Sequence, residues 1–163
     1  EKRRIYRNLG MAYARKGDEK KAEKAYLSAL DLDPESADVY LSLGNLAFNR
    51  GDYAEATRSY ELAAKNGENN ARLYLKLGLS HFNLSDYGSA ATHLGRSLDL
   101  DPSQIDARYY LGLAYFGDGE NRMARKALEA YVEKEKRLSK NAVVYKAKQL
   151  LDDIDRKLIR EMY

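Results

Sequence analysis

Tyr40-Leu-Ser-Leu-Gly44 and Ala56-Thr-Arg-Ser-Tyr60-Glu-Leu-Ala63 decide the fold, because their pattern returns before and after them at a spacing of 34 residues. Shifted back by 34, the pattern positions are Tyr6, Leu9, Gly10, Ala22, Tyr26 and Ala29. Shifted forward, they are Tyr74, Leu77, Gly78, Ala90, Leu94 and Ser97, and then Arg108, Leu111, Gly112, Ala124, Leu128 and Tyr131. A fixed period of this size is typical of a solenoid of stacked repeats.

Each unit carries the pattern of two amphipathic helices. In the first unit, Tyr6, Leu9 and Tyr13 recur at steps of three and four residues, which places them on one helical stripe. Lys16-Gly17-Asp18 then predicts a break, since glycine suits a left-handed C-terminal position and aspartate can cap the next helix. Asp33-Pro34 closes the unit, because the residue before a proline is pushed out of the helical region.

The pattern resembles the tetratricopeptide repeat family over residues 3–138. The resemblance implies an all-α, right-handed superhelical solenoid of helix-turn-helix repeats that serves as a protein-protein interaction scaffold. The implied repeats are 3–36, 37–70, 71–104 and 105–138. Residues 139–163 follow as a C-terminal capping or assembly helix, for which Ser139 or Asn141 is the candidate N-cap.

The recurring glycine lies inside the first helix of each unit, where it costs roughly 0.5–1 kcal/mol relative to alanine. We expect it to allow close approach of the second helix, and the resemblance assigns the contact to the positions of Ala22 and Ala29. Tyr131 replaces a small residue at the second of these positions. The tightness of the fourth helix pair therefore stays open.

The C-terminal segment carries an apolar stripe that must be buried. It consists of Val144, Ala147, Leu151, Ile154 and Leu158. The stripe can cap the fourth repeat, pair with a second copy, or enter the groove of a neighbouring molecule. We favour capping, with the residues beyond Ile154 projecting from the repeat.

The composition indicates an ordered helical chain and leaves the compartment open between cytoplasm and periplasm. The net charge is +3, but residues 1–24 hold nine Lys/Arg against four Asp/Glu, and residues 133–163 hold nine against six. The absence of cysteine excludes disulfides and thiolate chemistry. No apolar run approaches a membrane span. Because the chain begins at Glu1, we interpret it as an excerpt or a processed product.

The residues that could carry chemistry form no recognisable site. His81 and His93 are the only histidines, and His81 takes the place of Tyr13 and Tyr115 in other units, which predicts a packing role. Asp31-Leu-Asp33 lacks the following ligand and glycine of a calcium loop. We therefore expect no enzymatic activity, no cofactor and no metal.

The resemblance implies a concave groove lined by the first helix of each unit. The implied residues are Leu41, Asn45, Phe48, Asn49, Leu75, Leu79, Phe82, Asn83, Tyr109, Leu113 and Phe116. Three of them, Phe48, Phe82 and Phe116, recur at 34 and predict an aromatic ladder. An exposed apolar surface usually marks a binding site, although the same residues could serve only to pack neighbouring helices.

The predicted partner is another protein, which offers an apolar peptide or an amphipathic helix to this groove. The alternatives are self-assembly into a homo-oligomer and nucleic-acid binding through Arg3, Arg4, Arg7 and the 134–140 cluster. The acidic middle of the chain argues against nucleic acid. A family clamp for acidic C-termini would need asparagines where this chain has Met11 and Ser42, which disfavours chaperone tails.

Overall fold

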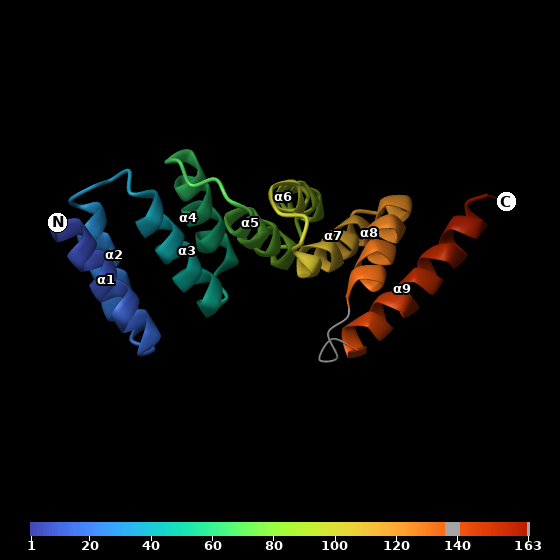
Figure 1. Cartoon of the computed structure of the whole chain (residues 1–163), viewed down its shortest axis with the longest axis horizontal. Helices are drawn as coiled ribbons and strands as arrows, with labels where there is room; N and C mark the ends of the chain where they lie inside the picture. The colour runs from blue at the N-terminus through green and yellow to red at the C-terminus, as the bar shows by residue number, and fades with distance from the viewer. Residues whose placement is uncertain (136–140, 163) are drawn as a thin grey trace. The chain divides into compact units, whose positions relative to one another are not determined.

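The computed structural model describes residues 1–135 and 141–162, and the helices within that part are arranged in consecutive pairs (Figure 1). The described helices are α1 (Lys2–Arg15), α2 (Glu19–Leu30), α3 (Ala37–Arg50), α4 (Tyr53–Lys65), α5 (Ala71–Asn83), α6 (Tyr87–Leu100), α7 (Ile105–Gly117), α8 (Asn121–Lys134) and α9 (Asn141–Arg160). The predicted all-α helix-turn-helix repeat is thereby confirmed. None of these helices is long and apolar enough to cross a membrane.

The turns of the first two helix pairs follow the predicted glycine-aspartate chemistry. Gly17 and Gly51 have φ of 78° and 82°, in the left-handed region that glycine adopts without strain. The carboxylate of Asp18 accepts a hydrogen bond from the Lys21 amide at 3.2 Å, and that of Asp52 accepts one from the Glu55 amide at 3.1 Å. These bonds satisfy backbone donors that the first helical turn leaves open.

Each mid-helix glycine lies against the large side chain sixteen residues later, and the expected contact with alanine was wrong. The pairs are Gly10 with Tyr26, Gly44 with Tyr60, Gly78 with Leu94, and Gly112 with Leu128. A Cβ atom on Gly10 would lie 2.5 Å from a ring carbon of Tyr26, and one on Gly112 would lie 2.6 Å from Cγ of Leu128. Glycine therefore opens a slot for a ring or leucine, which buries far more apolar area than alanine.

The chain divides into two compact units, Glu1–Asn69 and Asn70–Tyr163. The first unit contains α1 to α4, and α2 and α3 share a core of buried apolar residues. That core is made of Ala22, Tyr26, Ala29, Val39 and Leu46. The second unit contains α5 to α9 and has two cores, one around α6 and α7 and the other around α8 and α9.

Helix α9 lies against α8 along its described length, and the expected projection beyond Ile154 was wrong. Leu158 packs against the α8–α9 core, and Asn121 donates a hydrogen bond to Glu161 at 3.1 Å. Because these contacts join the end of α9 to the start of α8, the two helices run antiparallel. The first turn of α8 therefore covers the last turns of α9. Asn141 is the first residue of α9, and Ser139 lies outside the described residues.

Tyr131 does not loosen the fourth helix pair. The slot beside Gly112 is filled by Leu128, so a small residue is not required at position 131. Tyr131 is fully buried in the α8–α9 core, with its ring 5.1 Å from that of Tyr109. The substitution supplies aromatic area for the contact with α9.

Candidate functional site

The predicted groove residues lie on the first helix of three pairs, four on α3 in the first unit and seven on α5 and α7 in the second. In the first unit, α1, α2 and α3 surround a hollow of about 240 Å³. Its walls are Met11, Ala14, Arg15, Glu19, Tyr26, Ser42, Asn45, Leu46 and Asn49. Two predicted residues, Asn45 and Asn49, therefore line a real depression, together with apolar groups that the sequence did not single out.

The amides in this hollow are placed to meet a polar ligand. Oδ1 of Asn45 accepts a hydrogen bond from the Tyr60 hydroxyl at 3.0 Å, which fixes the orientation of the side chain. The remaining Nδ2 group is a donor that suits a peptide carbonyl. Asn49 is exposed at the rim. Burial raises the pKa of the Tyr26 hydroxyl at the floor, so it stays neutral at physiological pH.

The three phenylalanines of the expected ladder are half-buried, and each has a partner within its own unit. Phe48 meets Tyr53 edge to face at 5.3 Å, and Phe82 meets Tyr87 at 5.5 Å. Phe116 packs against the α8–α9 core, with Nζ of Lys157 lying 4.3 Å from its ring centroid. Each ring is thus partly used in packing and offers only part of its surface to a ligand.

The second unit has a hollow of about 440 Å³ where α5 meets the start of α7. It is lined by Arg72, Leu75, Ser103, Gln104, Ile105, Asp106 and Ala107. Leu75 belongs to the predicted groove, whereas the loop residues were not foreseen, because the 34-residue period does not show how loops fold back on a helix. Leu79 and Leu113 are half-buried farther along the same helices.

Two other predicted groove residues of this unit, Asn83 and Tyr109, have polar groups that are hydrogen-bonded within the helix or partly buried. Nδ2 of Asn83 donates to the Leu79 carbonyl at 2.7 Å, so its donor is engaged within the helix. Burial raises the pKa of the Tyr109 hydroxyl, which packs against the α8–α9 core. On α5, burial and then the charge of Arg72 lower the pKa of Lys76. The chemistry offered by α5 and α7 is therefore mainly apolar, with cations near the start of α5.

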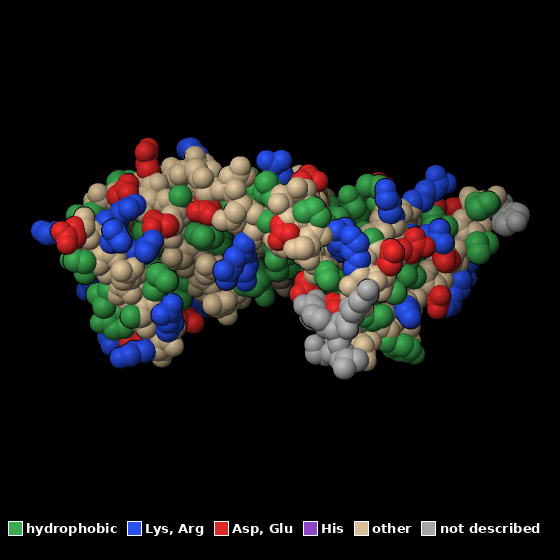
Figure 2. Space-filling view, in the orientation of Figure 1, with side chains coloured by type: hydrophobic (Ala, Val, Ile, Leu, Met, Phe, Trp, Pro, Cys, Tyr) green, Lys and Arg blue, Asp and Glu red, His purple; other side chains and the backbone are tan. Residues whose placement is uncertain are grey.

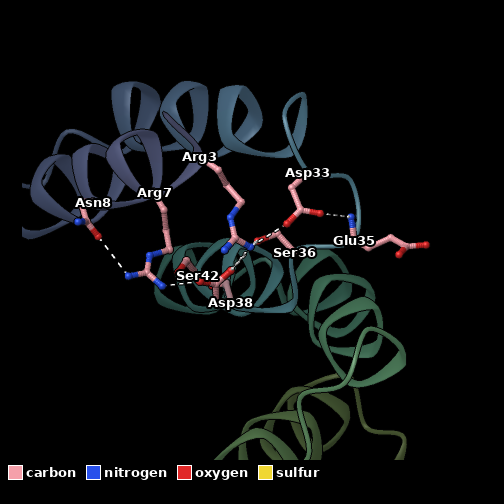
Figure 3. A network of polar contacts seen from close by, with 8 residues as sticks. All are labelled: Arg3, Arg7, Asn8, Asp33, Glu35, Ser36, Asp38 and Ser42. Atoms are coloured by element: carbon pink, nitrogen blue, oxygen red, sulfur yellow. Dashed lines mark hydrogen bonds and ion pairs between the residues drawn. The ribbon is translucent and has the colours of Figure 1, made fainter. Parts of the chain in front are cut away.

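Arg3 and Arg7 were candidates for nucleic-acid binding, but the structure uses them to join α1 to the start of α3 (Figure 3). Nη1 of Arg3 lies 2.8 Å from Oδ2 of Asp33 and 2.7 Å from Oγ of Ser36. Arg7 pairs with Asp38. These cations are neutralised by carboxylates and are poorly available for phosphates. Residues 136–140 of the predicted basic cluster lie outside the described residues.

The two histidines stack on one another, which agrees with the packing role predicted for His81. Their ring centroids are 5.2 Å apart, and Nδ1 of His81 lies 2.9 Å from Oδ2 of Asp86. The ring of His93 also stacks on Tyr74 at 6.1 Å. Within the part of the chain that is described, no group of three or more metal-ligating side chains comes together.

Comparison with known proteins supports the repeat pattern. The family model described as tetratricopeptide repeat matches residues 7–71 and 75–142. Among curated proteins, no significant match to the sequence is found.

Several solved structures share the fold. YrrB, described as a TPR protein with an unusual peptide-binding site, is 23% identical over 93% of this chain and 76% of its own, with a TM-score of 0.84. MamA is 28% identical over 96% of this chain and 87% of its own, with a TM-score of 0.81. MamA from Desulfovibrio magneticus RS-1 is 19% identical over 96% of this chain and 97% of its own, with a TM-score of 0.79.

Proposed function

The chain belongs to the tetratricopeptide repeat family, and we propose that it binds an apolar peptide or an amphipathic helix of a partner protein on the first helices of its pairs. Membership supports the general role of a protein-protein interaction scaffold. The specific site is the part that we propose. There are two such candidate surfaces, each within one unit: the hollow of the first unit, and the apolar faces of α5 and α7 in the second.

The observation that carries the proposal is the composition of the α1–α3 hollow. Met11 and Leu46 provide apolar walls, whereas Asn45 and Asn49 provide amides at neighbouring turns of one helix. This combination suits a peptide, because apolar walls hold side chains and amides hydrogen-bond a main chain that lacks its own partners. The YrrB description adds support by analogy, since a similar fold carries a peptide-binding site there.

In the second unit, Leu79 and Leu113 would contact the apolar side chains of a ligand bound there. Both are half-buried, and among the described residues neither packs with the cores around α6–α7 and α8–α9. Burying an exposed leucine surface contributes up to ~1.5–3 kcal/mol, so each could act as an anchor. Phe82 would contribute an edge of its ring beside them.

The test selects binders from a displayed library of random peptides and measures their affinity by fluorescence polarisation. We expect Asn49→Ala to weaken peptides held in the first-unit hollow and Leu79→Ala to weaken peptides held on the second unit, each about 5- to 30-fold, in line with the loss of an interface contact. Leu62→Ala is the matched control, since Leu62 is an exposed leucine on the second helix of its pair. Peptides that bind both groove variants as tightly as the unaltered chain would contradict the proposal.

The salt dependence of the binding affinity distinguishes peptide binding from nucleic-acid binding. Apolar capture should change little between low and high salt, whereas affinity for single-stranded DNA should fall steeply. Self-assembly is the other alternative, and sedimentation of the chain without peptide addresses it. A concentration-dependent oligomer that Leu79→Ala dissociates would identify a second copy as the occupant of the site.

A further inference from the structure

The hydrogen bond between Tyr60 and Asn45 determines which groups the hollow of the first unit offers to a ligand. The ring of Tyr60 is fully buried beside Gly44, where an added Cβ atom would lie 2.5 Å from a ring carbon. The hydroxyl at the end of this ring donates to Oδ1 of Asn45 at 3.0 Å. Because Tyr60 holds the oxygen of the amide, Nδ2 is the end of Asn45 that remains for a ligand. Asn45 lines the hollow, so the hollow offers a hydrogen-bond donor at this point.

The later repeats replace both members of this polar pair by leucine. In the third repeat, Leu79 stands in place of Asn45, and Leu94 stands in place of Tyr60. Leu94 fills the slot beside Gly78 with apolar atoms alone and brings no hydroxyl to the groove side of α5. The fourth repeat also has leucine at both positions. The groove-lining asparagine and the tyrosine that orients it therefore occur together in the first unit, whose hollow is the more polar of the two candidate surfaces.

A second tyrosine gives the same hollow a hydrogen-bond acceptor. Tyr26 is 3% exposed, and its hydroxyl interacts with the side chain of Ser42, which also lines the hollow. The hydroxyl of Ser42 donates to the Asp38 carbonyl at 2.8 Å, so its oxygen can only accept a further hydrogen bond. The proton of Tyr26 therefore points to Ser42. The oxygen of Tyr26 is left as an acceptor, opposite in character to the donor of Asn45.

The size and the walls of the hollow suit one neutral side chain with an apolar stem. Its volume of about 240 Å³ is below the roughly 300–1,000 Å³ of pockets for drug-sized ligands. Met11, Ala14 and Leu46 provide apolar wall, whereas Arg15 and Glu19 add one charge of each sign. Basic and acidic side chains also lie side by side over the first unit, at the left of Figure 2. A charged ligand side chain would meet a like charge here and lose hydration, whereas a neutral amide incurs neither cost.

We propose that the hollow is a subsite for a glutamine side chain of the bound peptide, and that the Tyr60 hydroxyl is the positioning group behind this selectivity. The glutamine methylenes lie against Met11 and Leu46. Its carbonyl oxygen accepts from Nδ2 of Asn45, and its amide donates to the oxygen of Tyr26. This selectivity rests on the proposed function, since a glutamine side chain reaches the hollow as part of a bound peptide.

The probes are the N-acetyl methylamides of glutamine, glutamate and methionine, whose side chains are similar in length. Each is titrated into the isotope-labelled chain, and NMR follows the side-chain amide resonances of Asn45. We expect glutamine to shift these resonances saturably and to bind at least fivefold more tightly than the other two.

Two variants test the roles of the polar pair. Tyr60→Phe keeps the buried ring and removes only the hydroxyl, so the preference for glutamine should fall below twofold. Asn45→Asp keeps an acceptor for Tyr60 and removes the donor, so glutamine should no longer bind. Tyr40→Phe is the matched control, because the Tyr40 hydroxyl donates to the Pro34 carbonyl at 2.9 Å outside the hollow. It should leave the preference unchanged.

The outcomes separate the glutamine subsite from the proposed peptide function. A Tyr60→Phe chain that loses stability but keeps the preference for glutamine would show that the hydroxyl is merely structural. Equal binding of methionine, tighter binding of glutamate, or no saturable shift with glutamine would each overturn the subsite. Library peptides that Asn49→Ala weakens, but that bind as well without glutamine, would overturn the subsite and leave the peptide function standing. Peptides that Asn49→Ala does not weaken would remove both from the first unit.

Discussion

The first and second units add different contacts to the apolar cores that join their helix pairs. In the first unit, α1 meets the start of α3 through Arg3 with Asp33 and Arg7 with Asp38, and all four side chains are partly exposed. In the second unit, α7 packs against α5 and α6 through an apolar core in which Phe82 meets Tyr110 edge to face at 5.7 Å. The same 34-residue repeat therefore supports a junction with added ion pairs and a junction with added aromatic contacts.

The difference follows from one position of the frame. Arg7 stands where the three later 34-residue repeats have Leu41, Leu75 and Tyr109. Partly exposed ion pairs contribute ~0–1 kcal/mol each and are screened by salt, whereas burying a large apolar side chain contributes ~1.5–3 kcal/mol. The contact between α2 and α3 is also less extensive than that between α6 and α7. We therefore expect the first junction to open more readily.

The largest effect should come from the aromatic junction. Phe82→Ala removes a half-buried ring that contacts Tyr87 and Tyr110, so we expect a loss of about 2–3 kcal/mol in the free energy of unfolding. Leu84→Ala is the control, because Leu84 is 45% exposed just after α5, and its loss should stay below ~0.5 kcal/mol. Urea unfolding measures both. Equal losses for the two variants would show that the ring does not stabilise the junction.

A smaller effect is expected at the polar junction. The double-mutant cycle of Arg7→Ala and Asp38→Asn should give a coupling free energy of ~0.5–1 kcal/mol, because both side chains are partly exposed. The coupling should shrink as salt rises, whereas the loss for Phe82→Ala should persist. Urea unfolding at two salt concentrations makes the comparison. If the coupling free energy were as large as the stability lost in Phe82→Ala and did not change with salt, the two junctions would not differ in the way proposed.

Much of this fold could be predicted because the same residue pattern occurs four times in the sequence. The spacing of 34 fixed the helix pairs, and glycine and aspartate at the turns have local chemical roles that sequence alone reveals. The candidate site was partly predictable for the same reason. Asn45 and Asn49, which the repeat pattern singled out, line the hollow of the first unit from α3.

What the sequence could not predict depends on contacts across space. The period shows that Gly10 needs a close neighbour, but the choice between Ala22 and Tyr26 depends on the rotation of α2 about its axis. Arg7 looked like a surface cation because its partner Asp38 lies 31 residues away. The Phe48 ring looked free because its contact with Tyr53 forms only when the turn closes. Each miss concerns a side chain whose partner belongs to another helix.

The smallest expected effect is the acid dependence of the polar junction. Burial alone would raise the pKa of Asp38, but hydrogen bonds from Ser36 and Arg7 and the charges of Arg7 and Arg3 hold it below the ordinary value of 3.8. A lowered folded-state pKa means that ionised Asp38 stabilises the fold above its unfolded value, and that this contribution is lost as pH falls through the folded value.

The unfolding free energies of the unaltered chain and of Asp38→Asn should therefore differ by a constant amount from neutral pH down to the ordinary aspartate value of 3.8. Below that value the difference should shrink, because protonation of Asp38 removes from the unaltered chain the carboxylate charge that Asp38→Asn already lacks. Other acidic residues titrate in both proteins, so subtracting the two urea curves isolates Asp38. Hydrogen exchange should show the accompanying opening in α1, and leave the α6–α7 core protected, because apolar packing has no such titration. A difference that stays constant down to strong acid would mean that the ionised carboxylate does not hold α1 to α3, and the contrast between the two junctions would then rest on packing alone.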